Sequence, residues 1–167
     1  MSSSPWDYIA KLVCIGDSGC GKSSLTIRLC EGRFSPHHDV TIGTFQHVTD
    51  WLNDLRQIAE PDIVVILVGN KADLARQEKN EREVTREEAE EWAKRNGVME
   101  YVETSAKSGE NVEKAFMRVA ERIYQNIQAG KYDLNDRRSG VKGPGAGNKG
   151  QVKVSNDPNQ SNAGGCC

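Results

Sequence analysis

The chain has 167 residues, of which 28% are charged, and a net charge of −2, as is typical of a single soluble domain. Charge this close to balance argues against binding to nucleic acid. No signal peptide is expected, because the N-terminus lacks a basic stretch followed by an apolar one, and the longest apolar run, Ile63 to Val68, is too short to span a bilayer. Five cysteines without disulfide-like spacing suit a reducing cytosol.

The first half of the chain predicts one strand and two helices. Apolar and β-branched residues from Ile9 to Ile15 predict a strand that runs into a glycine-rich loop. A helix is expected from Lys22 to about Cys30, and another from Phe45 to Ala59, where apolar residues recur every three or four positions. The loop between them, residues 31–44, is longer than most connections in compact domains, and no strand separates the two helices.

The second half predicts strands and helices in alternation. The continuous apolar run Ile63 to Val68 is typical of a strand buried on both faces. Thr85 and Glu88 form a capping box in front of the next helix. Met99 to Glu103 predict a short strand, and an apolar stripe from Val112 to Ile127 predicts the last helix. The alternation predicts an α/β fold in which helices cover a parallel sheet of about three strands.

Composition divides the chain into a flexible N-terminus, residues 1–8, a folded domain, residues 9–130, and a flexible tail, residues 131–167. The tail holds seven glycines and few large apolar residues. We therefore do not expect it to bury enough surface to offset the entropy lost on ordering. Its net charge is +3, whereas the rest of the chain carries −5.

Residues 16–23 read Gly-Asp-Ser-Gly-Cys-Gly-Lys-Ser, the pattern of a phosphate-binding loop between a strand and a helix. Glycines let backbone N–H groups turn inward around phosphate oxygens, and the helix N-terminus adds a favourable field. Lys22 is expected to reach the β- and γ-phosphates, and Ser23 to bind Mg²⁺. The alternative is an ordinary glycine turn, which the flanking strand and helix disfavour.

Two further motifs each follow a predicted strand. Asn70-Lys71-Ala72-Asp73 comes directly after the strand over 63–68, where ligands bind in open α/β sheets. A carboxylate there accepts two hydrogen bonds, from the ring N–H and the amino group of guanine, and adenine offers no matching pair. Thr104-Ser105-Ala106-Lys107 follows the next strand, and its backbone is expected to meet the base. Each motif alone is weak evidence, but three in this order predict a guanine nucleotide site.

The segments GDSGCGKS, VTIG, GNKADL and ETSAKSGENV, with the ending GGCC, resemble consecutive landmarks of the Rab branch of the Ras superfamily of small GTPases. The likeness runs from about residue 8 to residue 130. It implies a P-loop NTPase G domain, GTP and GDP as ligands with Mg²⁺, and a molecular switch in vesicle-mediated transport. The stretch IYQNIQAGKYDLN is similar to the Rab subgroup at Golgi and endosomal membranes.

The resemblance also implies roles for single residues. Phe34 matches the aromatic residue that stacks on guanine, and Thr41 matches the switch threonine that ligates Mg²⁺ and senses the γ-phosphate. The implied metal ligands are therefore Ser23 and Thr41. The implied nucleotide-binding positions are Gly16, Asp17, Ser18, Gly19, Cys20, Gly21, Lys22, Ser23, Ser24, Phe34, Thr41, Asn70, Lys71, Asp73, Ser105, Ala106 and Lys107.

The chain departs from the family in one place. Only 48 positions separate Lys22 from Asn70, about half the spacing in the family. After Gly43 the resemblance passes directly to the approach to the family's third helix, near Phe45, so about fifty residues are expected to be absent. The absent stretch would hold three of six strands and the WDTAGQE motif, which supplies an Mg²⁺-binding aspartate, a γ-phosphate-sensing glycine and a water-orienting glutamine. No catalytic residue is expected to remain, and GTP hydrolysis is expected to be absent or very slow.

Cys166 and Cys167 resemble the double-cysteine Rab ending that receives two geranylgeranyl groups, and two lipids anchor a protein stably where one does not. The expected location is the cytoplasmic face of Golgi or endosomal membranes, with a cytosolic pool. The partners implied by resemblance are guanine nucleotide, Rab escort and GDP-dissociation-inhibitor proteins, exchange factors and effectors. The alternative is an unmodified, exposed pair of cysteines.

Two other interpretations remain open at this point. A non-switching GTPase remnant, from a skipped segment or a faulty gene model, would bind nucleotide weakly or occupy escort proteins. A P-loop nucleotide kinase would need an arginine-rich lid and a second substrate site, and the motif over 70–73 argues against it.

Overall fold

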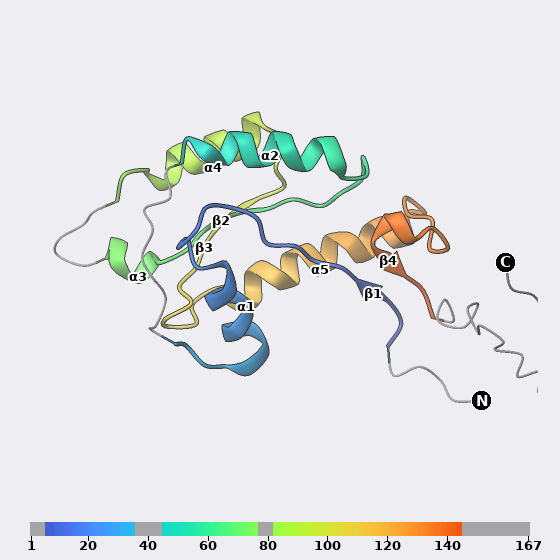
Figure 1. Cartoon of the computed structure of the whole chain (residues 1–167), viewed down its shortest axis with the longest axis horizontal. Helices are drawn as coiled ribbons and strands as arrows, with labels where there is room; N and C mark the ends of the chain where they lie inside the picture. The colour runs from blue at the N-terminus through green and yellow to red at the C-terminus, as the bar shows by residue number, and fades with distance from the viewer. Residues whose placement is uncertain (1–5, 36–44, 77–81, 145–167) are drawn as a thin grey trace, which may run out of the picture.

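The computed structural model of the chain describes residues 6–35, 45–76 and 82–144, and Figure 1 shows their arrangement. The helices are α1 (Lys22–Glu31), α2 (His47–Ile58), α3 (Ala72–Ala75), α4 (Arg86–Arg95) and α5 (Val112–Gln128). The strands are β1 (Ile9–Ala10), β2 (Leu67–Gly69), β3 (Tyr101–Glu103) and β4 (Val141–Lys142), and a 3-10 helix spans Arg137–Ser139. Within these ranges no helix combines the length and the apolar character needed to cross a membrane.

Three layers form around the parallel pair β2 and β3, with α2 and α4 on one face and α1 and α5 on the other (Figure 1). Alternate side chains of the apolar run enter opposite faces, as the geometry of an extended chain requires. Val65 and Leu67 pack toward α2 and α4. Val64 and Ile66 pack toward α5, and Val68 packs on the cluster that joins α1 to α5. The expectation of a segment covered on both faces is therefore confirmed for residues 64–68, but Ile63 is 44% exposed. The predicted strand is wrong over residues 63–66, because regular strand geometry begins only at Leu67.

The helices α1, α2, α4 and α5 agree with the sequence predictions, whereas the short helix α3 was not predicted. α1 lies between two glycines in the left-handed region, Gly21 with φ 93° and Gly32 with φ 67°. α4 begins at the predicted capping box: the Glu88 N–H donates to the Thr85 hydroxyl, and the Glu88 carboxylate accepts from the Thr85 N–H. The Thr85 N–H and the Thr85 hydroxyl both donate to the Glu88 carboxylate and lower its pKa below the usual value, the backbone N–H being the larger cause.

The strand predicted from Ile9 to Ile15 is wrong over residues 11–15. Only Ile9 and Ala10 form a strand, and they pair antiparallel with β4 instead of joining β2. The side chains of Leu12 and Val13 are 45% and 66% exposed. The physical reason is the lack of a partner: among the described residues β2 pairs with β3 alone, and no described strand lies beside residues 11–15 for them to pair with. The four described strands thus form two separate two-stranded sheets.

The expectation of a flexible tail from residue 131 is wrong over residues 131–144, which contain a 3-10 helix and β4. Residues 131–144 fold back along α5, where Val141 is buried against Val119 and Ile123. The hydroxyl of Tyr132 accepts a hydrogen bond from the Asn126 amide at 3.1 Å and donates to the carbonyl of Asp62 at 3.0 Å. This segment therefore joins α5, the approach to β2 and the N-terminal strand. The rest of the expected tail, residues 145–167, lies outside the described residues, as does the expected N-terminal segment up to residue 5.

Candidate functional site

The glycine-rich loop closes around the side chain of Lys22. The Lys22 ammonium donates to the carbonyl of Gly16 at 2.8 Å and to the carbonyl of Asp17 at 2.7 Å. Gly16, Gly19 and Gly21 have φ of 137°, 73° and 93°, values that residues other than glycine adopt only with backbone strain. The sequence thus places glycine where the backbone turns sharply, and the lysine stands at the centre of the turn at the start of α1.

Asn70 joins this loop to the end of β3. Its amide nitrogen donates to the Cys20 carbonyl at 3.0 Å, and its amide oxygen accepts from the Ala106 N–H at 3.1 Å and the Thr104 hydroxyl at 3.3 Å. A side chain at Gly21 would collide with the Asn70 amide. One side chain therefore holds together two segments that are 86 positions apart in the sequence.

Asp73 lies at the start of α3 and is oriented by Ser105. The Ser105 hydroxyl donates to Asp73 Oδ1 at 2.7 Å and accepts from the Ser108 N–H at 3.1 Å. Ser105 is fully buried, so its hydroxyl has little freedom to turn. Lys71, with φ 66°, makes the turn that brings Asp73 back toward the end of β3. The carboxylate is thus presented by a buried donor on the neighbouring loop.

Two arginines brace the same loops. Arg28 of α1 donates from Nε to the Ala106 carbonyl at 2.7 Å and from Nη2 to the Lys107 carbonyl at 2.5 Å. Arg76, after α3, forms a two-pronged ion pair with Glu110 at 2.6 and 2.7 Å. Hydrogen bonding to Arg76 holds the pKa of the Glu110 carboxyl below its usual value, so this pair is charged at neutral pH.

The other side of the glycine-rich loop contacts α2. Asp17 accepts from the Trp51 indole N–H at 2.9 Å through one carboxylate oxygen, and its other oxygen lies 2.9 Å from His47 Nδ1. A shallow hollow here is lined by these three residues together with Asp50 and Asp54. Its acidic character disfavours a phosphate at this spot, which leaves the glycine-rich turn as the candidate phosphate site.

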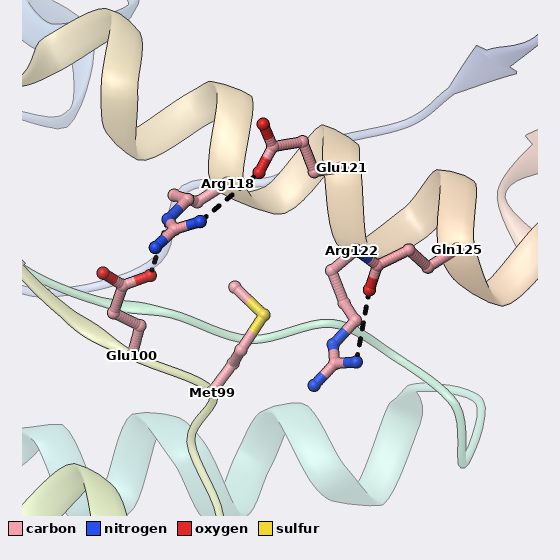
Figure 2. A pocket seen from close by; sticks show the side chains of 6 residues that line it. All are labelled: Met99, Glu100, Arg118, Glu121, Arg122 and Gln125. Atoms are coloured by element: carbon pink, nitrogen blue, oxygen red, sulfur yellow. Dashed lines mark hydrogen bonds and ion pairs between the residues drawn. The ribbon is translucent and has the colours of Figure 1, made fainter.

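A larger hollow, of about 250 Å³, lies between α5 and the chain that leads into β3. Figure 2 shows Arg118 between Glu100 and Glu121, at 3.2 and 3.5 Å, and Arg122 hydrogen-bonded to Gln125 at 3.4 Å. Its arginines are thus engaged by side chains of the hollow itself. None of the residues from the three motifs lines it, and we do not consider it the functional site.

The structure brings most of the predicted site residues together. Loops 16–23, 70–73 and 104–107 meet through Asn70, Ser105 and Arg28. Phe34 lies two residues beyond Gly32, with its side chain 36% exposed, and its stacking role stays a prediction. Thr41, Cys166 and Cys167 lie outside the described residues. Among the described residues no group of three or more His, Cys, Asp or Glu side chains could hold a metal ion, and Ser23 is the predicted metal ligand that the structure places.

Sequence analysis missed two contributors to these loops. Thr104 is fully buried and donates to Asn70, and its place inside the motif over 104–107 was the available signal. Arg28 lies outside every motif, about 1.7 turns along α1 from Lys22, and nothing in the sequence pattern marks it.

The left-handed glycines, the lysine and the helix N-terminus fit a polyphosphate, because they put backbone N–H groups, a cation and a helix dipole at one place. Asp73 and the loop 104–107 fit a base with adjacent donors. A family model described as the Ras family matches the chain in two segments, residues 11–44 and 43–125. Because these segments span more than half of the chain, the protein belongs to the Ras family, whose members are small GTPases that bind guanine nucleotides.

Proposed function

We propose that this chain is a Rab-type small GTPase that binds GDP and GTP with Mg²⁺, acts in vesicle-mediated transport and hydrolyses GTP very slowly or not at all. The observation that carries the proposal is the hydrogen bonding of Asn70, which links the glycine-rich loop to the loop that would meet the base. The glycine-rich loop and the loop 104–107 thereby lie beside each other, as a single site for the phosphates and the base would require. Membership of the family supports the nucleotide, and the Rab assignment rests on the motifs and the paired terminal cysteines.

The slow hydrolysis follows from what the sequence lacks. No Asp-x-x-Gly element stands between Lys22 and Asn70. The family model matches in two segments that meet at residues 43–44, which supports an internal omission at that point. Positioning and charge stabilisation carry most of phosphoryl-transfer catalysis, so a site without the sensing glycine and the water-orienting glutamine should not accelerate cleavage.

Calorimetric titration of the full-length chain with GDP and Mg²⁺ tests binding, with Lys22→Ala as the variant expected to lose the phosphate contact. Single-turnover cleavage of bound GTP tests the second half of the proposal. The expected result is GDP binding that ADP does not reproduce, with GTP persisting far longer than on an intact small GTPase. Cleavage at an ordinary family rate would contradict the proposed hydrolytic defect.

We further propose that Cys166 and Cys167 carry two geranylgeranyl groups, which would place the protein on the cytoplasmic face of Golgi or endosomal membranes. The proposal includes escort and GDP-dissociation-inhibitor proteins, exchange factors and effectors as partners. Intact mass after expression in eukaryotic cells gives the number of lipids directly. A chain of unmodified mass, while a control protein with the same ending is lipidated, would contradict it.

One observation favours a second candidate, a non-switching remnant that binds nucleotide without capturing partners. The segment that leads into the glycine-rich loop has no described strand neighbour over residues 11–15, and Val13 is 66% exposed. A GTP-dependent change in the affinity for an effector is the discriminating measurement. Equal affinity of the GDP and GTP forms would favour the remnant.

A further inference from the structure

The structure points to Arg28 as a positioning residue that sets the selectivity for guanine, an inference that rests on the proposed nucleotide binding. Arg28 contacts neither the glycine-rich loop nor Asp73 directly in the hydrogen bonds that the structure records. We infer that it acts through the loop 104–107, by holding two successive carbonyls of that loop against α1.

The guanidinium of Arg28 is anchored at both ends. Its Nη1 donates to the carbonyl of Gly32 at 2.6 Å, at the C-terminal end of its own helix. Its Nε and Nη2 donate to the carbonyls of Ala106 and Lys107 at 2.7 and 2.5 Å. The planar fork of arginine therefore spans three acceptors, and a lysine, with one flexible ammonium, could not reproduce this geometry.

These bonds are transmitted to the base-reading carboxylate. Among the described residues every peptide bond is trans, so fixing the Lys107 carbonyl also fixes the direction of the Ser108 N–H on the same peptide. The Ser108 N–H donates to the Ser105 hydroxyl at 3.1 Å, and that hydroxyl donates to Asp73 Oδ1 at 2.7 Å. The path from Arg28 to Asp73 is thus one peptide plane and one buried hydroxyl.

The path from Arg28 to Asp73 matters for the alignment of the loops because the described strands form two separate sheets and not one continuous sheet. α1 begins at Lys22 of the glycine-rich loop, whereas Asp73 and Ser105 follow β2 and β3. β1 pairs with β4, and β2 pairs with β3, so no described strand pairing connects the phosphate side to the base side. The two sides are joined by the apolar cluster of Leu25, Ala106 and Val112, on which Val68 of β2 packs. The side-chain hydrogen bonds of Asn70 and Arg28 join them as well.

The test compares GDP with inosine diphosphate, which keeps the ring N–H and both phosphates but lacks the amino group that a correctly placed carboxylate accepts from. Both are titrated against the full chain with Mg²⁺, as wild type and as Arg28→Met. The variant is expected to lower the ratio of GDP to inosine diphosphate affinity by about tenfold, because a displaced carboxylate forfeits one charge-assisted hydrogen bond. A general loss of fold would weaken both nucleotides alike and leave the ratio unchanged.

The matched control is Arg86→Met, which removes an equal charge from an exposed helix position where Arg86 pairs with Glu90 at 2.7 Å. Its affinity ratio should equal that of wild type. If Arg28→Met does not melt cooperatively, Arg28→Lys keeps the charge and the aliphatic stem, and it too should lower the ratio. An unchanged ratio in a folded Arg28 variant overturns the inference alone. Wild-type chain that binds neither nucleotide overturns the proposed function and this inference together.

Discussion

Two regions of the molecule differ in how their backbone is held in place. Around Asn70 the three motif loops are joined by hydrogen bonds between distant segments, and Thr104 and Ser105 are fully buried. Along residues 11–15, which lead into one of those loops, apolar side chains face solvent. The Lys11 N–H donates to the Gly140 carbonyl at 2.8 Å, but none of these residues belongs to a strand in the described part of the chain. The contrast teaches that a loop can be held by polar side chains from its neighbours, whereas a strand depends on another strand beside it.

The same negative charge placed in each region should have very different effects on stability. Val102 of β3 is 5% exposed and Val13 is 66% exposed. Val102→Asp should unfold the chain or cost more than about 3 kcal/mol of unfolding free energy, because the carboxylate would be buried without a partner. Val13→Asp should change the unfolding free energy by less than about 0.5 kcal/mol, as is usual for exposed sites.

Urea denaturation followed by circular dichroism measures both variants. Equal destabilisation of the two would show that residues 11–15 are buried in solution, for example in a sheet with another chain, and would remove the contrast between the regions.

The next largest effect is expected for Asn70→Ala, which tests whether the loop cluster is held by side chains. The change removes the bonds to Cys20, Ala106 and Thr104 and leaves buried partners unsatisfied. The affinity for GDP should fall by about 100-fold, since each lost bond is worth about 1 kcal/mol. Asn53→Ala on the exposed face of α2 is the control and should bind as wild type does. Unchanged binding by Asn70→Ala would mean that the sheet, not this side chain, aligns the loops.

A smaller effect on stability, with little effect on nucleotide affinity, is expected at the end of α5 that lies far from the motif loops. Val141 is 5% exposed and packs against α5, away from the three motifs. Val141→Ala should lower the unfolding free energy by about 1–2 kcal/mol through the cavity it leaves. The GDP affinity of the folded fraction should stay within about twofold of wild type. A large loss of affinity would show that residues 131–144 are coupled to the nucleotide site.

The smallest expected effect concerns alkaline pH. Burial raises the pKa of Tyr101 to about 12, and the nearby Glu103 carboxylate acts in the same direction. From the ordinary pKa of 10.0 up to about 12, the unfolded chain loses the phenolic proton while the folded chain retains it, so stability should fall as pH rises through that window. Tyr101→Phe should show a weaker decline of the urea midpoint between about pH 10 and about pH 12 than wild type. Parallel declines in the two proteins would contradict the shifted pKa.

The sequence predicted the features that depend on neighbouring residues, and it did not predict those that depend on distant parts of the chain. The helices follow from local periodicity and caps, as the Thr85–Glu88 box shows, and the motif loops follow from residues whose backbone requirements are local. The strand over 11–15 could not be judged locally, because its fate depends on a neighbour elsewhere in the chain. The packing of residues 131–144 rests on Tyr132 and Val141, which show no regular spacing. Arg28 belongs to no motif, because its role arises only when α1 packs beside the loop 104–107 in the folded protein.

The pairing of β1 with β4 has a topological consequence. Ile9 lies opposite Lys142 and Ala10 opposite Val141, so the two ends of the main folded body meet in one short antiparallel pair. A few added residues could join them covalently, and the chain could then be reopened elsewhere as a circular permutant. Such a permutant would keep β2, β3 and the motif loops in their present contacts, while β4 and β1 would become the two strands of one continuous hairpin.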